Sequence, residues 1–459
     1  MRKYRLMSLF TAAVMAGSAL MCGAAAYAQT TPVPAFIIED EPFDAGEAIS
    51  DVAQEDPIQL FGCTVPADAK KVCFIAGDEF DGMAQLYRDY SEDYGENYFY
   101  FPSYITIDCA EIAEKLPELT DLSITKATVK NLESLSGMKK LKTLELHLNE
   151  GTDDISFLTS LPKLTTFKIT QPFGREIKDL SPIASLTKLK KLLISCKSEQ
   201  ELSMLSGLKK LTDLDLDFDF PDIKPLSKLT RLKKLKLDSA GLTDISPLSK
   251  LKKLTSLEIL GNYKIKDITA VGKLTKLKTL TLHSVNADSV AVLKKLEQLE
   301  SLTLMYMKCT DARKVVSGLT TLKSLSITDV DMGRDCGFLK KLKNLDALFM
   351  MYPGFTSIDG IQGCKNLKSL WLQDNAISDL SPLSKLKKLE FLNLSNSGIT
   401  DISALAKLKN LRTVYIQGNK IEDYSALSGL KNPQFIWSDG ITEDVRSALQ
   451  KANPVCVII

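Results

Sequence analysis

Several ingredients of common active sites are scarce in this chain of 459 residues. It has only two histidines, His147 and His283, and it has no C-x-x-C pair, nucleophile elbow, phosphate loop or zinc signature. After residue 28, no apolar run reaches the 18 or more residues that a membrane helix needs. Aromatic residues make up 7% of the chain, with two tryptophans. We therefore expect no enzyme, no metal or cofactor site, and no membrane span beyond the first 28 residues.

Leucine, in contrast, is abundant and regularly spaced. The motif Leu-x-x-Leu-x-Leu, in which another apolar residue sometimes replaces a leucine, recurs about every 22 residues. Its copies start at Leu119, Leu141, Leu164, Leu189, Leu211, Leu232, Leu254, Leu277, Leu299, Leu322, Leu345, Leu367, Leu389 and Leu411. A period held this long indicates a solenoid of stacked turns, because each turn can bury its leucines only against its neighbours.

A single turn shows what each position does. Around Leu370-Trp-Leu372 every second residue is apolar, which predicts a strand with alternate side chains turned inward. Asn375, eight residues after the first leucine, can bond the backbone of the turn that leaves the strand. Ser381-Pro382 then reads as an N-cap followed by proline at the first helical position. We therefore expect a parallel β-sheet whose strands are linked by short helical or 3₁₀ returns.

These motifs resemble the leucine-rich repeat family, in particular the 22-residue bacterial class found in internalin-type surface proteins, over about residues 102–439. The asparagine position is incompletely filled: Asn149, Asn262, Asn375 and Asn419 occupy it, whereas Ala240, Val285 and Pro353 replace asparagine elsewhere. The resemblance implies an α/β solenoid with the sheet on its concave face and a cap at each end. It also implies a protein ligand on that face, without specifying which.

The ends of the chain predict its export and its caps. Residues 1–28 read as a signal peptide cleaved after Ala28, so a secreted or cell-surface protein is expected; lipidation at Cys22 is the alternative, although its preceding residues fit a lipoprotein box poorly. Residues 29–60 form an acidic flexible leader, 61–118 an N-terminal cap, 119–439 the solenoid and 440–459 a C-terminal cap. Residues 29–101 carry a net charge of −13 and residues 102–459 one of +11.

Within the caps, three short elements are predicted. A helix capped by Asp108 should run through Ile112 and Leu116, and a second helix should span 442–451. The last residues, 456–459, match a prenylation pattern in form, but in an exported chain a terminal strand over the last turn is the better interpretation.

The cysteines divide into two groups. Cys309, Cys336 and Cys364 lie at or near core positions of their turns and are expected to be buried thiols. Cys63 and Cys73 bracket a short polar loop, so a disulfide between them is plausible in an exported protein, with Cys109 as a competing partner.

Charged residues follow the turns. Lysines mostly precede the strands, so stacking places them along one edge of the sheet, either as a solvated edge or as an attractor of anionic polymers. Asp213, Asp215 and Asp217 alternate along one predicted strand beside Lys234 and Lys236 on the next, which predicts cross-strand ion pairs. The two histidines are six turns apart and cannot act together.

Large side chains gather at outward positions of the last turns. The predicted partner-binding residues are Phe349, Met351, Tyr352, Trp371, Phe391, Tyr415 and Trp437. Tryptophan and tyrosine are enriched in binding hot spots, so the leading hypothesis is a non-catalytic protein-binding module of the adhesin or surface-receptor type. The alternative is a binder of glycans or anionic cell-wall polymers that uses the aromatic strip and the lysine edge; nucleic acid is not expected as a partner. The aromatic residues could instead be covered by the C-terminal cap or serve only as sheet formers.

Overall fold

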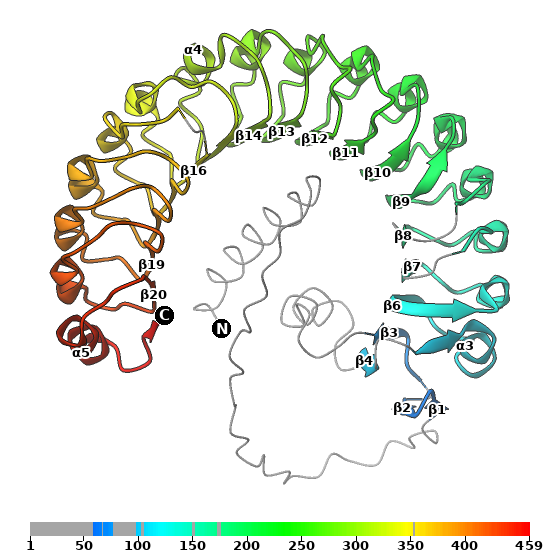
Figure 1. The fold of residues 1–459 in the computed structure, drawn as a ribbon. Helices are drawn as coiled ribbons and strands as arrows, with labels where there is room; N and C mark the ends of the chain where they lie inside the picture. Colours follow the sequence, from blue (N-terminus) through cyan, green and yellow to red (C-terminus); the bar gives the residue numbers. More distant parts are fainter. Residues whose placement is uncertain are drawn as a thin grey trace.

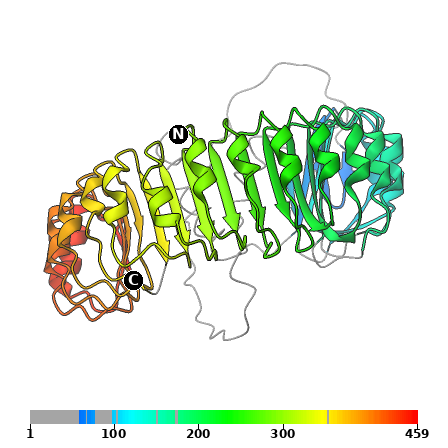
Figure 2. The same cartoon turned by 90° about the horizontal axis from the view of Figure 1, so that it is seen from above.

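The chain forms a horseshoe-shaped solenoid, described by a computed structural model for residues 58–66, 68–76, 98–101, 105–148, 152–171, 176–351 and 354–459. One parallel sheet lines the inner, concave side, and short helical returns line the outer side (Figures 1 and 2). The predicted repeat fold is therefore confirmed. The signal peptide, most of the leader, Asn149, Tyr352 and Pro353 lie outside the described residues.

The concave sheet has the strand order β4–β3–β6 and then continues turn by turn to β21, with every pairing parallel. Its strands are β3 (Lys71–Ala76), β4 (Tyr98–Phe101), β6 (Asp121–Lys130), β7 (Thr143–Leu148), β8 (Thr166–Gln171), β9 (Lys191–Glu199), β10 (Asp213–Asp219), β11 (Lys234–Asp238), β12 (Ser256–Leu260), β13 (Thr279–His283), β14 (Ser301–Met305), β15 (Ser324–Thr328), β16 (Ala347–Met351), β17 (Ser369–Trp371), β18 (Phe391–Asn393), β19 (Thr413–Tyr415), β20 (Phe435–Trp437) and β21 (Val457–Ile458).

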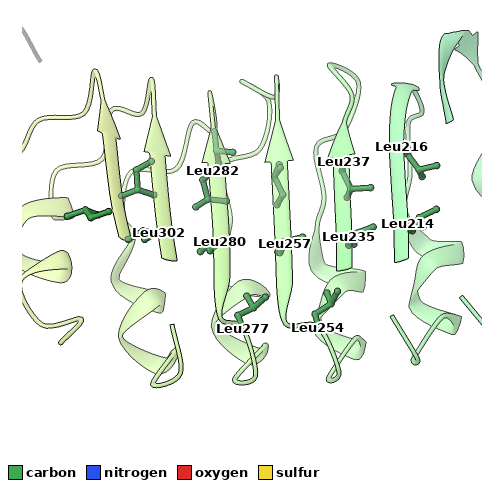
Figure 3. Close-up of a cluster of buried hydrophobic side chains, with 14 of the residues drawn as sticks. Leu214, Leu216, Leu235, Leu237, Leu254, Leu257, Leu277, Leu280, Leu282 and Leu302 are labelled. Atoms are coloured by element: carbon green, nitrogen blue, oxygen red, sulfur yellow. The ribbon is translucent and has the colours of Figure 1, made fainter. Parts of the chain in front are cut away.

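Strands pair in register from turn to turn, so equivalent positions of the repeat form straight columns. Leu348, Leu370 and Leu392 lie side by side on three successive strands, and Phe349 pairs with Trp371 in the next column. Figure 3 shows leucines of equivalent positions stacked between neighbouring strands. The leucines at these inward positions are buried. Burying each one stabilises the fold by about 1.5–3 kcal/mol, and the core is continuous along the solenoid.

Most returns on the convex side are 3₁₀ helices. They are η1 (Leu132–Gly137), η2 (Ser156–Ser160), η3 (Ser181–Ser185), η4 (Leu202–Gly207), η5 (Lys224–Lys228), η6 (Ser246–Lys250), η7 (Val271–Lys273), η8 (Ala291–Lys295), η9 (Gly337–Lys341), η10 (Ile361–Gly363), η11 (Ser381–Lys385), η12 (Ser403–Lys407) and η13 (Ser425–Gly429), with α4 (Ala312–Val316) as an α-helical return. Ser381 is the first residue of η11 rather than its N-cap. The Asp379 carboxylate, two residues earlier, accepts the Ser381 N–H at 2.8 Å and so takes the capping role.

The short elements predicted near the two ends are present. The helix α3 (Cys109–Lys115) is capped by the Asp108 side chain, which accepts the Ala110 N–H. The helix α5 (Glu443–Ala452) begins after Thr442, and the terminal strand β21 pairs with β20. At the N-terminal end the sheet continues two strands further than expected, because β3 pairs in parallel with β6 and β4 pairs in parallel with β3.

Two further small elements complete this end. A two-stranded antiparallel ribbon, β1 (Ile58–Leu60) and β2 (Cys63–Val65), contributes Leu60 and Val65 to the core. The short strand β5 (Thr106–Asp108) pairs with the second half of β6. Among the residues that the structure describes, no helix is both long and apolar enough to cross a bilayer.

The predicted asparagine ladder holds the turns that leave the strands. The amide of the buried Asn375 donates to the carbonyl oxygens of Met350, Leu372 and Gln373 at 2.9–3.1 Å. The Asn419 amide, two turns further along the chain, donates to three backbone carbonyls in the same way. Each amide therefore satisfies backbone groups that would otherwise be buried without a partner.

Candidate functional site: an aromatic row on the concave face

Six aromatic rings form a continuous row along the concave face at the C-terminal end of the sheet. Ring centroids are 6.5 Å apart between Phe349 and Trp371, 4.3 Å between Trp371 and Phe391, and 5.6 Å between Phe391 and Tyr415. Tyr415 then lies 5.2 Å from Phe435 and 6.0 Å from Trp437. All of these separations except that of Trp371 and Phe391, which is slightly shorter, fall within the range of about 4.5–7 Å for favourable aromatic pairs.

The strands position these rings because of the two-residue alternation along each strand. Leu370 of β17 points into the core, so Trp371 must point to the concave side. The register then places Tyr415 of β19 beside Trp437 of β20. The row therefore follows from the repeat itself, since two neighbouring outward positions recur on successive strands.

Exposure is uneven along the row. Trp371 is 9% exposed and Phe391 8% exposed, whereas Trp437 is 41% exposed. Phe349 and Tyr415 are half-buried, and burial raises the pKa of the Tyr415 phenol. The predicted centre at Trp371 is thus largely covered, with rings from both adjacent strands packed against it. The most accessible ring of the row is Trp437, at its C-terminal end.

The C-terminal segment continues the sheet instead of folding back over the rings. Its strand β21 pairs edge to edge with β20, and the Ser438 N–H donates to the Ile459 carbonyl at 2.9 Å. The strand β21 therefore lies beside β20 in the sheet and not over the tryptophans, as the alternative interpretation would require. Trp437 keeps an open face beside this added strand.

One ring of the row was not among the predicted site residues. Phe435 stands in the same column as Phe391, two turns further along the sheet. Phe435 lies in the last turn, where Pro433 stands in place of the first leucine and the motif Leu-x-x-Leu-x-Leu no longer marks the register. Continuing the 22-residue count from Leu411 would have placed it at an outward position.

Of the other two predicted residues, the structure describes one. Met351 is half-buried at the end of β16, and Tyr352 lies outside the described residues. Asn393 stands between Trp371 and Tyr415 in their column of the sheet, and its amide donates to the Gln373 side-chain oxygen at 2.6 Å. The site thus combines aromatic faces with fixed hydrogen-bonding groups.

The cross-strand ion pairs predicted for the acidic strand form only in part. Lys236 of β11 lies 3.4 Å from Asp215 of β10, whereas Asp213 is in register with Lys234 but accepts a hydrogen bond from the Thr212 hydroxyl. Asp217 accepts a hydrogen bond from the Ser195 hydroxyl at 2.7 Å. Burial raises the pKa of Asp215, and the charge of Lys236 opposes this shift. Within the described ranges, no three His, Cys, Asp or Glu side chains are grouped so that they could hold a metal ion.

The two histidines lie on strands β7 and β13, far apart in the sheet. His147 shares a 2.8 Å hydrogen bond with the Thr170 hydroxyl, and burial lowers the pKa of His147 to about 4. His283 packs edge-on against the Tyr306 ring at 5.3 Å. Each histidine therefore has its own structural neighbours, and the two do not form a common site.

Cys63 and Cys73 are both free thiols, so the structure does not contain the expected disulfide. The reason is orientation. Cys63 packs against the core, on the same side of β3 as Phe74. Cys73 points to the opposite side, where it is in register with Ser123, and burial raises its pKa to about 12. Cys309, Cys336 and Cys364 are buried thiols, as predicted.

The lysine edge is less uniform than the sequence suggested. Over the later turns it forms a cavity of about 630 Å³, which is lined by charged residues of both signs. Glu300 pairs with Lys278 at 3.0 Å and with Lys323 at 2.7 Å, and these bonds lower the pKa of the Glu300 carboxyl. Ion pairs therefore offset much of the charge in this part of the edge.

Comparison with known proteins agrees with the repeat fold seen in the structure. Residues 217–435 match the leucine-rich repeat region family, in agreement with the repeat fold of this part of the chain. No curated protein matches it.

Three solved structures illustrate the likeness. An internalin of Listeria monocytogenes is 27% identical, with a TM-score of 0.47, over 66% of this chain and 81% of its own. A leucine-rich repeat protein of Leptospira interrogans is 23% identical, with a TM-score of 0.53, over 77% and 89%. A plant peptide hormone receptor, solved in complex with the peptide RGF2, is 16% identical, with a TM-score of 0.50, over 77% and 61%.

Proposed function

We propose that this protein is an exported, non-catalytic binding module of the adhesin or surface-receptor type, and that the concave aromatic row is its protein-binding site. The observation that carries the proposal is the contiguity of the row. Ring follows ring from Phe349 to Trp437, although aromatic residues are only 7% of the chain. Rigid rings bury large areas at a small cost in side-chain entropy, which is why they dominate binding hot spots.

The proposal assigns the first contact to the open end of the row. Trp437 and Tyr415 have accessible ring surface, while Trp371 and Phe391 form a packed floor behind them. A partner would extend the stack across β19 and β20, and the Gln373 and Asn393 amides would fix its orientation. The plant structure of similar fold is a peptide hormone receptor in complex with RGF2, which supports the class of partner.

A capture experiment with a matched control tests this proposal. The purified protein is compared with Trp437→Ala and with Tyr263→Ala, since Tyr263 is a 67% exposed aromatic residue on a loop outside the row. A specific partner is one that the wild type and Tyr263→Ala retain and Trp437→Ala loses, and that binds again as a purified component. Equal capture by all three forms would contradict the proposal.

A glycan is the second candidate ligand, because hydrogen-bonding amides beside stacked rings also suit sugar hydroxyls. The bonded pair of Gln373 and Asn393 is the observation that favours it. Binding of a neutral oligosaccharide that Trp437→Ala abolishes, with no protein captured, would establish this alternative.

A further inference from the structure

A second surface, distinct from the aromatic row, runs along the edge of the sheet where the strands begin. It consists of the residues just before and just after the first leucine of each motif, over the seven turns from Leu141 to Leu277. Eleven of these fourteen positions are basic and none is acidic. We call them the basic edge: Lys140, Lys142, Lys163, Lys188, Lys190, Lys210, Arg231, Lys233, Lys253, Lys276 and Lys278. All are exposed.

Little of this charge is neutralised. Among the described residues, ion pairs reach the basic edge only at its two ends, where Lys140 meets Glu118 and Lys278 meets Glu300. The acidic residue on the adjoining strand end, Asp213, instead accepts a hydrogen bond from the Thr212 hydroxyl at 2.6 Å. Like charges repeated at successive turns add to one another, so the edge carries a strong local positive potential.

The fold does not require lysine at these positions. In later turns the residue before the first leucine is Asn344, Asn366 or Asn410, whose amide donates to a backbone carbonyl of the preceding turn at 2.7–3.0 Å. In the basic stretch the threonines that alternate with lysine, such as Thr165 and Thr212, donate to backbone carbonyls in the same manner. Neutral residues therefore satisfy the structural role, and the lysines are additional to it.

In the later turns, the equivalent positions along the same edge of the sheet carry almost no excess of positive charge. From Gln298 to Arg412, the equivalent positions hold four basic and three acidic residues. Glu300 bridges Lys278 and Lys323 in this part. The same architecture thus carries a concentrated positive charge on one half and a nearly neutral edge on the other. Solubility of the sheet edge alone does not explain that division.

We propose that the basic edge binds a linear anionic polysaccharide, independently of the partner site at the aromatic row. The charges form a line with rungs about 4.8 Å apart, about 30 Å long, which matches an extended polymer better than a compact ligand. Ten of the eleven residues are lysines, which attract anions as point charges without the paired geometry of arginine. None of the positions is aromatic, so the stacking that retains single-stranded nucleic acid is missing from the edge.

The test measures binding of the purified protein to polygalacturonate by isothermal titration calorimetry at low and at high ionic strength. The triple variant Lys210→Gln/Arg231→Gln/Lys253→Gln removes three central charges of the edge. The matched control, Lys295→Gln/Lys341→Gln/Lys385→Gln, removes three exposed lysines of the convex returns η8, η9 and η11. We expect affinity to fall about tenfold in the edge variant, as for the loss of three exposed charge pairs, and to stay unchanged in the control.

Three results would overturn this assignment. Wild-type protein that fails to bind polygalacturonate at low salt contradicts it directly. An equal loss of affinity in the edge variant and the control variant would show that binding depends on the net charge of the protein and not on the basic edge. Tighter binding of single-stranded DNA than of polygalacturonate would assign the edge to nucleic acid instead. A Trp437→Ala variant should bind polygalacturonate normally, so the outcome here does not depend on the fate of the aromatic row.

Discussion

Replacing Leu370 by alanine should strongly destabilise the protein. Leu370 is fully buried in β17, in register with Leu348 on one neighbouring strand and Leu392 on the other. Removing three carbons there leaves a cavity between two stacked turns, and both turns are held in place by further buried leucines. The free energy of unfolding should fall by about 2–5 kcal/mol, the range for a buried leucine at a site that cannot collapse.

The matched control is Lys368→Ala, two residues earlier, whose side chain is exposed. It should change the free energy of unfolding by no more than about 0.5 kcal/mol. Urea unfolding, followed by circular dichroism and by tryptophan fluorescence, measures both variants. Trp371 adjoins the site, so the two signals also reveal whether the turns unfold together. Similar losses for the two substitutions would refute the register, because shifting a strand by one residue exchanges its two faces.

Two further predictions concern single polar groups. Asn375→Ala should lower the free energy of unfolding, measured in urea, by about 1–3 kcal/mol, because several buried carbonyls lose their donor. Asn375→Ser should recover part of this loss, since Ser397 occupies the equivalent position and donates to the Leu372 carbonyl. An Asn375→Ala protein as stable as the wild type would contradict the role of the asparagine ladder. Burial lowers the pKa of His147 to about 4, so the unfolded chain takes up a proton first and stability should decline as the pH falls from 6.5 towards 4. In His147→Gln this part of the pH dependence should disappear, and an unchanged profile by thermal unfolding would show that His147 is not its source.

Most of the fold could be predicted from the repeat period, because the period determines which residues of each strand face inward. Once Leu367 is set as the first position, Leu370 and Leu372 must be buried and Trp371 must lie on the concave face, as the structure shows. A second, local signal predicted where the two end helices begin, at Asp108 and near Thr442, because capping residues precede apolar helical patterns there.

Other features depend on contacts between turns, which a period does not reveal. Strand β3 has no leucine motif, yet Val72 and Phe74 pair with Leu122 and Ile124 of β6 and extend the sheet. The sequence also gave no sign that Tyr306 has a left-handed backbone, with φ of 52°. This conformation recurs where strands end, and glycine occupies the place in only some turns.

The candidate site was predictable in position but not in exposure. Counting by 22 residues identified the column that holds Phe349, Trp371, Tyr415 and Trp437. How much of each ring stays open depends on three-dimensional packing, which covers Trp371 and leaves Trp437 accessible. The expected disulfide was wrong for a related reason, because spacing along the chain does not tell on which side of a strand a cysteine points.

The affinity of Trp437→Ala for a purified partner is the most direct test of the central claim, that the concave aromatic row binds a protein ligand. The account predicts that the dissociation constant rises by about thirtyfold, equivalent to about 2 kcal/mol for the loss of a hot-spot ring. Tyr263→Ala, which removes a more exposed ring outside the row, should bind as the wild type does. Unchanged affinity in a correctly folded Trp437→Ala, or an equal loss in Tyr263→Ala, would contradict the claim.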